Sequence, residues 1–135
     1  MKYLIPLLFI VFLASHISAQ ISLIANKNVD LQVSNLQQVS DIYTLETTSA
    51  GNQKIALFDL KGGSVKDSFL SFIGKKANEL KMIWMKATLA GDGKAPELLD
   101  DEASVLQKIA STPGAIGYVS SSSVTPDVKV LFELK

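Results

Sequence analysis

Residues Pro113-Gly114-Ala115-Ile116-Gly117-Tyr118-Val119 decide the fold, because they join a helix stop directly to a short apolar run. The turn signal Thr112-Pro113-Gly114 ends the helical pattern that precedes it. The run 115–119 has the length and apolar character of a buried strand. An earlier turn, Gly62-Gly63-Ser64, follows another apolar run and opens an amphipathic helix. The two segments together indicate that strands and helices alternate along the chain.

The rest of the chain continues this alternation. Four apolar runs predict strands, at 21–25, 54–58, 115–119 and 128–134. Periodic apolar residues predict four helices: one with a Ser34–Gln37 capping box, one capped by Ser64 and ended by Gly74, one over 77–89, and one capped by Asp100 or Asp101. A loop through Pro96 is expected before the last helix. The pattern predicts an α/β fold with a mixed or partly parallel sheet flanked by about four helices.

The first 19 residues have the pattern of a secretory signal peptide. Lys2 supplies the positive charge, 4–13 is apolar apart from Pro6, and Ile17-Ser18-Ala19 offers a cleavage site before Gln20. We therefore expect residues 1–19 to be removed on export and residues 20–135 to form one domain. The rival interpretation is an uncleaved anchor, although the apolar run is shorter than the roughly 20 residues that a membrane span needs.

Composition argues against enzyme and metal chemistry. The chain has no Cys, its one His is His16 in the leader, and all 13 of its basic residues are Lys. These absences exclude Ser-His-Asp and Cys-His catalysis, thiolate or imidazole metal sites, and guanidinium recognition of anions. Acidic residues also number 13, and this balance gives no reason to expect a nucleic acid partner. We expect no enzyme activity, no cofactor, no metal, and no membrane span after cleavage.

Several motifs resemble the substrate-binding proteins of phosphate ABC transporters. The 113–119 segment matches that family almost letter for letter. The segment 58–64, Phe-Asp-Leu-Lys-Gly-Gly-Ser, lies where the family has a strand, an Arg-containing turn and a Ser-Gly-Thr helix start. Asp41-Ile42-Tyr43 lies at a family helix end that precedes a glycine-lysine segment, which is 44–47 here, and 80–84 matches a helix ending in Trp. The resemblance covers residues 21–131 and implies a single lobe of a periplasmic-binding-protein type II fold.

The resemblance also implies an oxyanion site at the helix start after the glycine pair. In the family, a Ser hydroxyl and the next backbone amides hold phosphate, because first-turn amides lack intrahelical partners and the helix dipole is positive there. Carried over, the ligand-binding set is Gly62, Gly63, Ser64, Val65, Lys66 and Lys61. The chain departs from the family in three ways: the turn has no Arg, Val65-Lys66 replaces Gly-Thr, and a second lobe is missing.

These features predict an exported, periplasmic domain that binds phosphate or a similar small oxyanion weakly, with an envelope protein or a second copy as a further partner. An alternative is a domain that has lost ligand binding and serves as an interaction or sensory module of the cell envelope. A hydrolase using Ser64 with Lys61 or Lys66 would require a buried Lys beside the serine. Plain structural roles also stay open, with Ser64 as a cap only and Trp84 as a core residue.

Overall fold

The computed structural model describes residues 20–135, and the leader expected over residues 1–19 lies outside them. The strands are β1 (Ile21–Ala25), β2 (Ser49–Ala50), β3 (Gln53–Lys54), β4 (Ala56–Leu60), β5 (Glu97–Leu99), β6 (Ala115–Ser120) and β7 (Lys129–Leu134). The helices are α1 (Leu36–Tyr43), α2 (Ser64–Ile73), α3 (Ala77–Ala90) and α4 (Glu102–Ser111), with a 3-10 turn at Ser121–Ser123. Across residues 20–135, no helix has the length and apolar character needed to cross a membrane.

The main sheet is mixed and has five strands in the order β5-β4-β6-β1-β7. β4 runs parallel to both β5 and β6, whereas β1 runs antiparallel to β6 and β7. β2 and β3 form a separate hairpin. Parallel strands need long crossover connections. α2 and α3 form the connection from β4 to its neighbour β5, and α4 forms the one from β5 to β6 on the other side of β4. The α/β fold predicted from the sequence, with its mixed sheet and four helices in the described part, is confirmed.

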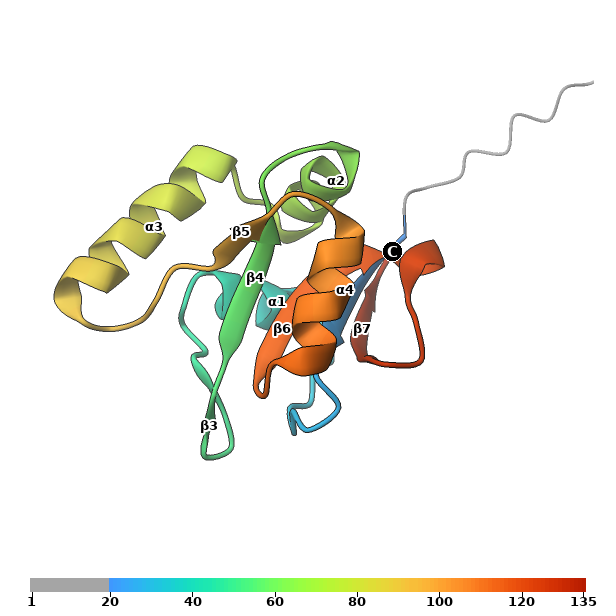
Figure 1. Cartoon of the computed structure of the whole chain (residues 1–135). Helices are drawn as coiled ribbons and strands as arrows, with labels where there is room; N and C mark the ends of the chain where they lie inside the picture. The colour runs from blue at the N-terminus through green and yellow to red at the C-terminus, as the bar shows by residue number, and fades with distance from the viewer. Residues whose placement is uncertain (1–19) are drawn as a thin grey trace, which may run out of the picture.

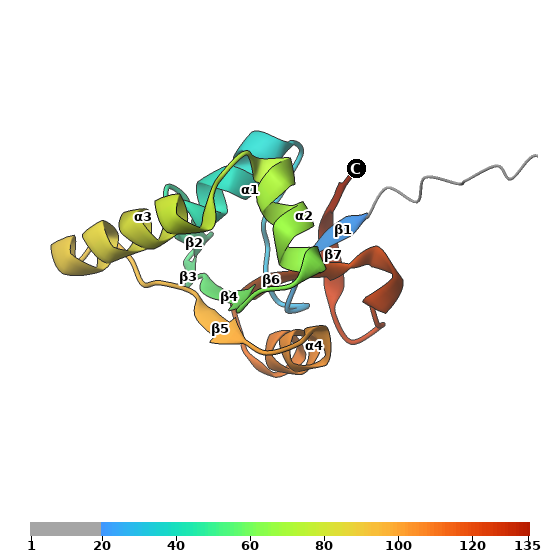
Figure 2. The same cartoon turned by 90° about the horizontal axis from the view of Figure 1, so that it is seen from above.

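Helices cover both faces of the sheet (Figures 1 and 2). On one face α2 contacts α1, β1 and β6, and on the other face α4 contacts β4, β6 and β1. The apolar core lies in these two interfaces. α3 extends outward from the β5 edge and buries only Leu80 and Trp84 fully. Both α2 and α4 start at the edge where the parallel strands β4 and β5 end.

Two glycines of the 113–119 motif determine how β6 fits between its neighbours. Gly114 has a φ of +79°, and a Cβ there would lie 2.5 Å from the Lys54 carbonyl oxygen. Gly117 faces α4, and its added Cβ would lie 2.6 Å from Ile109 Cδ1 and 3.2 Å from Val105 Cγ1. The motif therefore encodes a turn and a close helix–sheet contact, since only glycine meets both demands without strain.

Some boundaries differ from those predicted. Asn35, not Ser34, caps α1, and its side chain accepts a hydrogen bond from the Gln38 amide at 2.9 Å. β4 begins later than predicted, at Ala56, because the residues before it turn back into the β2–β3 hairpin. β5 occupies part of the stretch expected as a loop, since a short, largely exposed strand carries little apolar signal.

Candidate functional site

The predicted oxyanion site lies where β4 leads into α2. The loop of Lys61, Gly62 and Gly63 is exposed, and Ser64 is the first helical residue. Gly63 occupies the N-cap with a φ of +101°, a conformation that favours glycine. The expectation that Ser64 caps the helix is therefore wrong by one residue. Its hydroxyl stays exposed at the helix start, and the chain supplies no side-chain cap there.

The other long crossover helix on this edge starts differently. At α4 the Asp101 carboxylate accepts a hydrogen bond from the Ser104 amide at 2.8 Å, so Asp101 is the cap of the two candidates that the sequence offered. This bond lowers the pKa of the Asp101 carboxyl below its usual value. The first-turn amides of α2 have no such acceptor, so their partial positive charge faces solvent. Asp67, also in the first turn of α2, is the opposing negative charge nearby.

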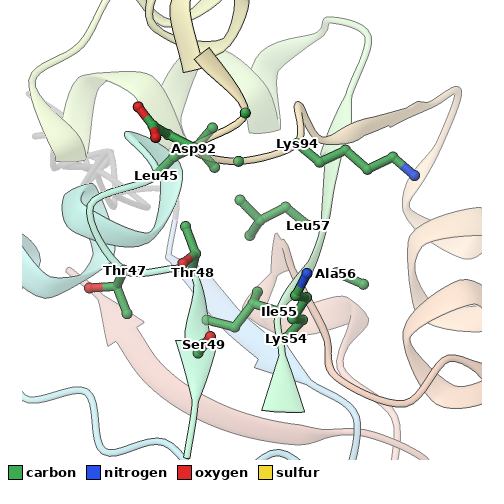
Figure 3. Close-up of a pocket in the computed structure, with 12 residues that line it drawn as sticks. Leu45, Thr47, Thr48, Ser49, Lys54, Ile55, Ala56, Leu57, Asp92 and Lys94 are labelled. Carbon is green, nitrogen blue, oxygen red and sulfur yellow. The ribbon is translucent and has the colours of Figure 1, made fainter. Parts of the chain in front are cut away.

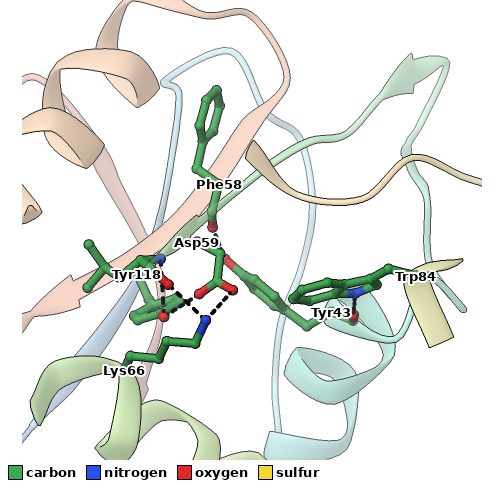
Figure 4. A network of polar contacts seen from close by, with 7 residues as sticks. Tyr43, Phe58, Asp59, Lys66, Trp84 and Tyr118 are labelled. Atoms are coloured by element: carbon green, nitrogen blue, oxygen red, sulfur yellow. Dashed lines mark hydrogen bonds and ion pairs between the residues drawn. The ribbon is translucent and has the colours of Figure 1, made fainter. Parts of the chain in front are cut away.

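A buried ion pair anchors the first turn of α2 to β4 (Figure 4). The Lys66 ammonium lies 3.1 Å from the Asp59 carboxylate and donates a hydrogen bond to the Leu60 carbonyl at 2.8 Å. Asp59 also accepts a hydrogen bond from the Tyr118 hydroxyl on β6 at 2.5 Å. The Asp59 carboxylate therefore points into the core, toward Lys66 and Tyr118. Only the backbone amide of Lys66 remains free to meet an anion at the helix start.

The same ion pair bears on the hydrolase alternative. Lys66 is buried, but its ammonium is held by Asp59 and the Leu60 carbonyl, and no hydrogen bond joins it to the Ser64 hydroxyl in the described residues. A nucleophilic serine needs a neighbouring base within hydrogen-bond reach. Lys61 does not provide one either, because its exposed ammonium pairs with Asp100 at 2.8 Å. The geometry therefore gives the hydrolase interpretation no support.

An aromatic cluster holds α2 in place above the sheet. The rings of Phe69 and Tyr118 stack with centroids 3.8 Å apart, and the Tyr43 ring meets Phe69 edge-on at 4.8 Å. Burial, followed by the nearby Asp59 carboxylate, raises the pKa of the Tyr118 phenol well above its usual range. Burial likewise raises the pKa of Tyr43, whose hydroxyl donates to the Phe58 carbonyl at 2.8 Å. This packing fixes the position and direction of the helix start.

Beside the helix start lies a pocket of about 300 Å³ between α2, α3 and β5, which we call the α2–α3 pocket. Lys61, Gly62, Lys66 and Asp67 line the end near the helix start, and Lys81 lines the α3 side. Its apolar walls are Leu70, Ala77, Leu80, Trp84, Ala95, Pro96 and Leu98. Trp84 is a core residue, as predicted, and its Nε1 donates to the Tyr43 carbonyl at 2.7 Å.

A second cavity, of about 470 Å³, lies at the other end of β4 (Figure 3). Ile55 and Leu57 line it from the β4 side, and Asp92 and Lys94 lie on the opposite loop. Leu45, another lining residue, has a φ of +63° in the segment where the resembling family has a glycine. None of the residues predicted to bind an oxyanion line this cavity.

The predicted site residues lie together at the start of α2. The backbone amide of Lys66 is available there, whereas its side chain forms the buried ion pair with Asp59. Gly62, Gly63 and Ser64 are exposed to solvent, and Val65, which follows them, is half-buried. Sequence reasoning missed the Asp59–Lys66 pair and its Tyr118 partner. The alternation of side chains along β4 could have indicated this pair. Asp59 lies on the same face of β4 as the buried Leu57, and a buried carboxylate needs a hydrogen-bonding or charged partner.

Comparison with known proteins gives matches among solved structures. No protein-family model matches the chain, and no curated protein matches it. A Clostridium perfringens protein described as a phosphate ABC transporter substrate-binding protein, solved with bound phosphate, is 26% identical with a TM-score of 0.67. An ABC-type phosphate transport receptor from Vibrio cholerae is 20% identical with a TM-score of 0.65, and PstS from Borrelia burgdorferi is 18% identical with a TM-score of 0.56.

The three matches cover similar shares of the chains compared. Each covers 84% of this chain but only 45%, 46% and 47% of the three relatives. The chain thus spans about half the length of the proteins it matches. Over that half it has the α/β fold of phosphate-transporter substrate-binding proteins, which is the extent expected of a single lobe.

Proposed function

We propose that this chain is an exported, non-enzymatic domain that binds phosphate or a similar small oxyanion weakly at the first turn of α2. The observation that carries the proposal is the uncapped helix start, reached through an exposed glycine loop. The amides of Ser64, Val65 and Lys66, together with the Ser64 hydroxyl, are the donors in this proposal. The similarity to a phosphate-bound substrate-binding protein supports it. The leader expected over residues 1–19 supports export, and a periplasmic location is part of the proposal.

Weak binding follows from what surrounds those donors. The loop and Ser64 are exposed, so a bound dianion stays hydrated on its outer side and the helix dipole acts through a high dielectric. The side chain of Lys66 is held by Asp59, and Lys61 is the cation left at the rim. Its ion pair with Asp100 is exposed and costs little to exchange for a ligand. We expect dissociation constants in the millimolar range for inorganic phosphate.

The direct test is a calorimetric titration with phosphate of protein purified after expression of the full chain. Ser64→Ala removes the hydroxyl, and we expect binding to weaken several-fold. Ser64→Asp places a carboxylate at the first helical position, where it favours the helix but repels an anion, so binding should be lost while the melting temperature holds. Ala103→Asp is the matched control, since it adds the same charge to the first turn of α4.

Saturable heat that survives Ser64→Asp would contradict the proposed site. Absence of heat and of any thermal shift at millimolar phosphate would contradict oxyanion binding itself. The fold assignment does not depend on either result.

A second candidate function, an interaction module, is favoured by the outer face of α3. Met82, Met85 and Leu89 are 60%, 62% and 82% exposed. Their spacing places them on one side of the helix, opposite the buried Leu80 and Trp84. A helix that is apolar on two opposite faces has one face without a partner in the monomer, and such patches mark association surfaces.

A second copy of the chain is the first partner to test. We expect sedimentation to show an association that grows with concentration and disappears when Met82, Met85 and Leu89 are all changed to Gln. Lys81→Gln on the same helix is the control and should leave association unchanged. Strictly monomeric behaviour of the unchanged protein at high concentration would contradict self-association.

A further inference from the structure

We infer that the α2–α3 pocket binds a small organic anion, with the charged group at the Lys61–Gly62 end and an apolar group against Trp84. The pocket volume, about 300 Å³, suits a ligand larger than a bare oxyanion. Its apolar walls come from three elements, α2, α3 and β5, so they enclose a ligand from several sides. Inorganic phosphate has no group that these walls would contact.

The apolar part of the pocket is held in position before any ligand arrives. Trp84 is 6% exposed, and its indole is fixed by the hydrogen bond to the Tyr43 carbonyl. Leu80 beside it is fully buried in the core. Leu98 on β5 is 42% exposed and forms an outer wall. Rigid aromatic and aliphatic walls favour binding because little side-chain freedom is lost when a ligand enters.

The charged residues of the pocket favour an anion. Three lysines line it, together with a single carboxylate, Asp67. The charge of Lys66 is already paired with Asp59, so Lys61 and Lys81 are the two cations that can meet a ligand. In the described residues Lys81 makes no ion pair, and the pairing of Lys61 with Asp100 is exposed. Both cations can therefore turn to a ligand at little cost. Asp67 opposes them, which makes it a direct probe of the sign of the ligand charge.

The inference rests on the proposed function in one respect, because the anionic head group lies at the same helix start. It goes beyond that function by naming the ligand class as a phosphate monoester with a short apolar group. For inorganic phosphate the α2 amides are the main donors. For the organic anion the pocket walls add apolar contact that phosphate cannot make.

The test uses cyclohexyl phosphate and the fluorescence of Trp84, which is the one tryptophan of the chain. We expect a saturable change in emission and a dissociation constant at least about tenfold below that of inorganic phosphate, the factor given by burying roughly 60 Å² of apolar surface. Cyclohexylamine, which has the same ring and the opposite charge, should give no saturable change.

Two matched variants locate the binding. Leu98→Asp places a carboxylate on the exposed outer wall and should abolish the response, whereas Met85→Asp makes the same kind of change on the outer face of α3 and should not. Lys81→Gln should weaken binding several-fold. Asp67→Asn should strengthen it several-fold, because it removes the opposing charge.

An equal affinity for phosphate and cyclohexyl phosphate, a response that persists in Leu98→Asp, or a weaker response in Asp67→Asn would overturn the inference. If phosphate binds and is lost in Ser64→Asp while cyclohexyl phosphate gains nothing, the inference fails and the proposed function stands. If cyclohexyl phosphate binds through the pocket and Ser64→Asp has no effect on either compound, the proposed function fails, and so does the placement of the head group at the helix start, while the apolar pocket itself stands.

Discussion

The starts of α2 and α4 lie at the same edge of the sheet, yet only one of them is closed by its own sequence. At α4 the Asp101 side chain binds the Ser104 amide, so the chain supplies the negative group that a helix start favours. At α2 a glycine with positive φ occupies the cap position, and the amides face solvent. A helix start that its own sequence leaves uncapped is therefore a place where an external anion can take over the role of a cap.

The two helices also differ in how they are fastened. α2 is held by the Asp59–Lys66 ion pair and the stack of Phe69 on Tyr118, whereas α4 packs Val105 and Ile109 against the bare backbone of Gly117. A polar anchor thus lies directly beneath the open helix start. The apolar contact lies beneath the closed one.

Lys66→Met should have the largest effect on stability. The substitution leaves the Asp59 carboxylate buried without its cation, and breaking a buried pair in this way costs about 3–5 kcal/mol. Urea unfolding measures the change. A loss below about 1 kcal/mol would indicate that Tyr118 alone satisfies Asp59 and that the ion pair does not anchor α2.

High pH should have the second-largest effect, because it destabilises the buried tyrosines that pack under α2. The described residues contain two tyrosines, Tyr43 and Tyr118, and burial raises the pKa of both above 10 in the folded protein. Their stabilising contribution is complete below the unfolded value near 10 and falls as pH rises above it, by about 1.4 kcal/mol per pH unit for each group. Absorbance at alkaline pH should show phenolate only together with unfolding. Ionisation near pH 10 in the folded protein would contradict the buried hydrogen bonds.

Gly117→Ala tests the α4 side and should cost about 1–3 kcal/mol, because the new methyl group meets the ends of Ile109 and Val105. Gly62→Ala is the control, since a Cβ there meets nothing within 4 Å. Thermal unfolding of both variants measures the difference. Equal stability of the two variants would show that α4 shifts outward freely and that the close contact is not required.

Loss of the Asp101 charge at low pH should have the smallest effect, and this effect concerns the start of α4. The Ser104 amide lowers the pKa of Asp101, so its contribution is present above the unfolded value near 3.8 and is lost as pH falls through the lower folded value. Asp101→Asn keeps the cap but removes the titration. Below pH 4, the melting temperature of the unchanged protein should therefore fall slightly more than that of Asp101→Asn. An identical decrease in the two proteins would rule out this cap as a titrating group.

The sequence was a good guide where local chemistry decides the structure. The Asp101 cap, the Gly74 stop of α2 and the strand after Gly114 follow from residue type and spacing, and the structure has all three. The cap of α2 was placed one residue late because serine is a good cap, and the pattern does not reveal that Gly63 takes the positive φ.

Contacts between distant segments were beyond sequence reasoning. Asp59 and Lys66 were both identified near the site, but their pairing depends on α2 folding back over β4 and on Tyr118 arriving from β6. The α2–α3 pocket likewise depends on β5, a strand whose apolar signal is too weak to predict. Neither feature is encoded in a single local pattern.

The central claim is that the open helix start of α2, and not the capped start of α4, receives an oxyanion. The most direct measurement follows backbone amide resonances by NMR during a phosphate titration. We predict saturable shifts of the Ser64, Val65 and Lys66 amides, with the amides of α4 from Glu102 to Ser104 unmoved. Shifts of equal size at both helix starts, or none at α2 while the protein stays folded, would contradict the account.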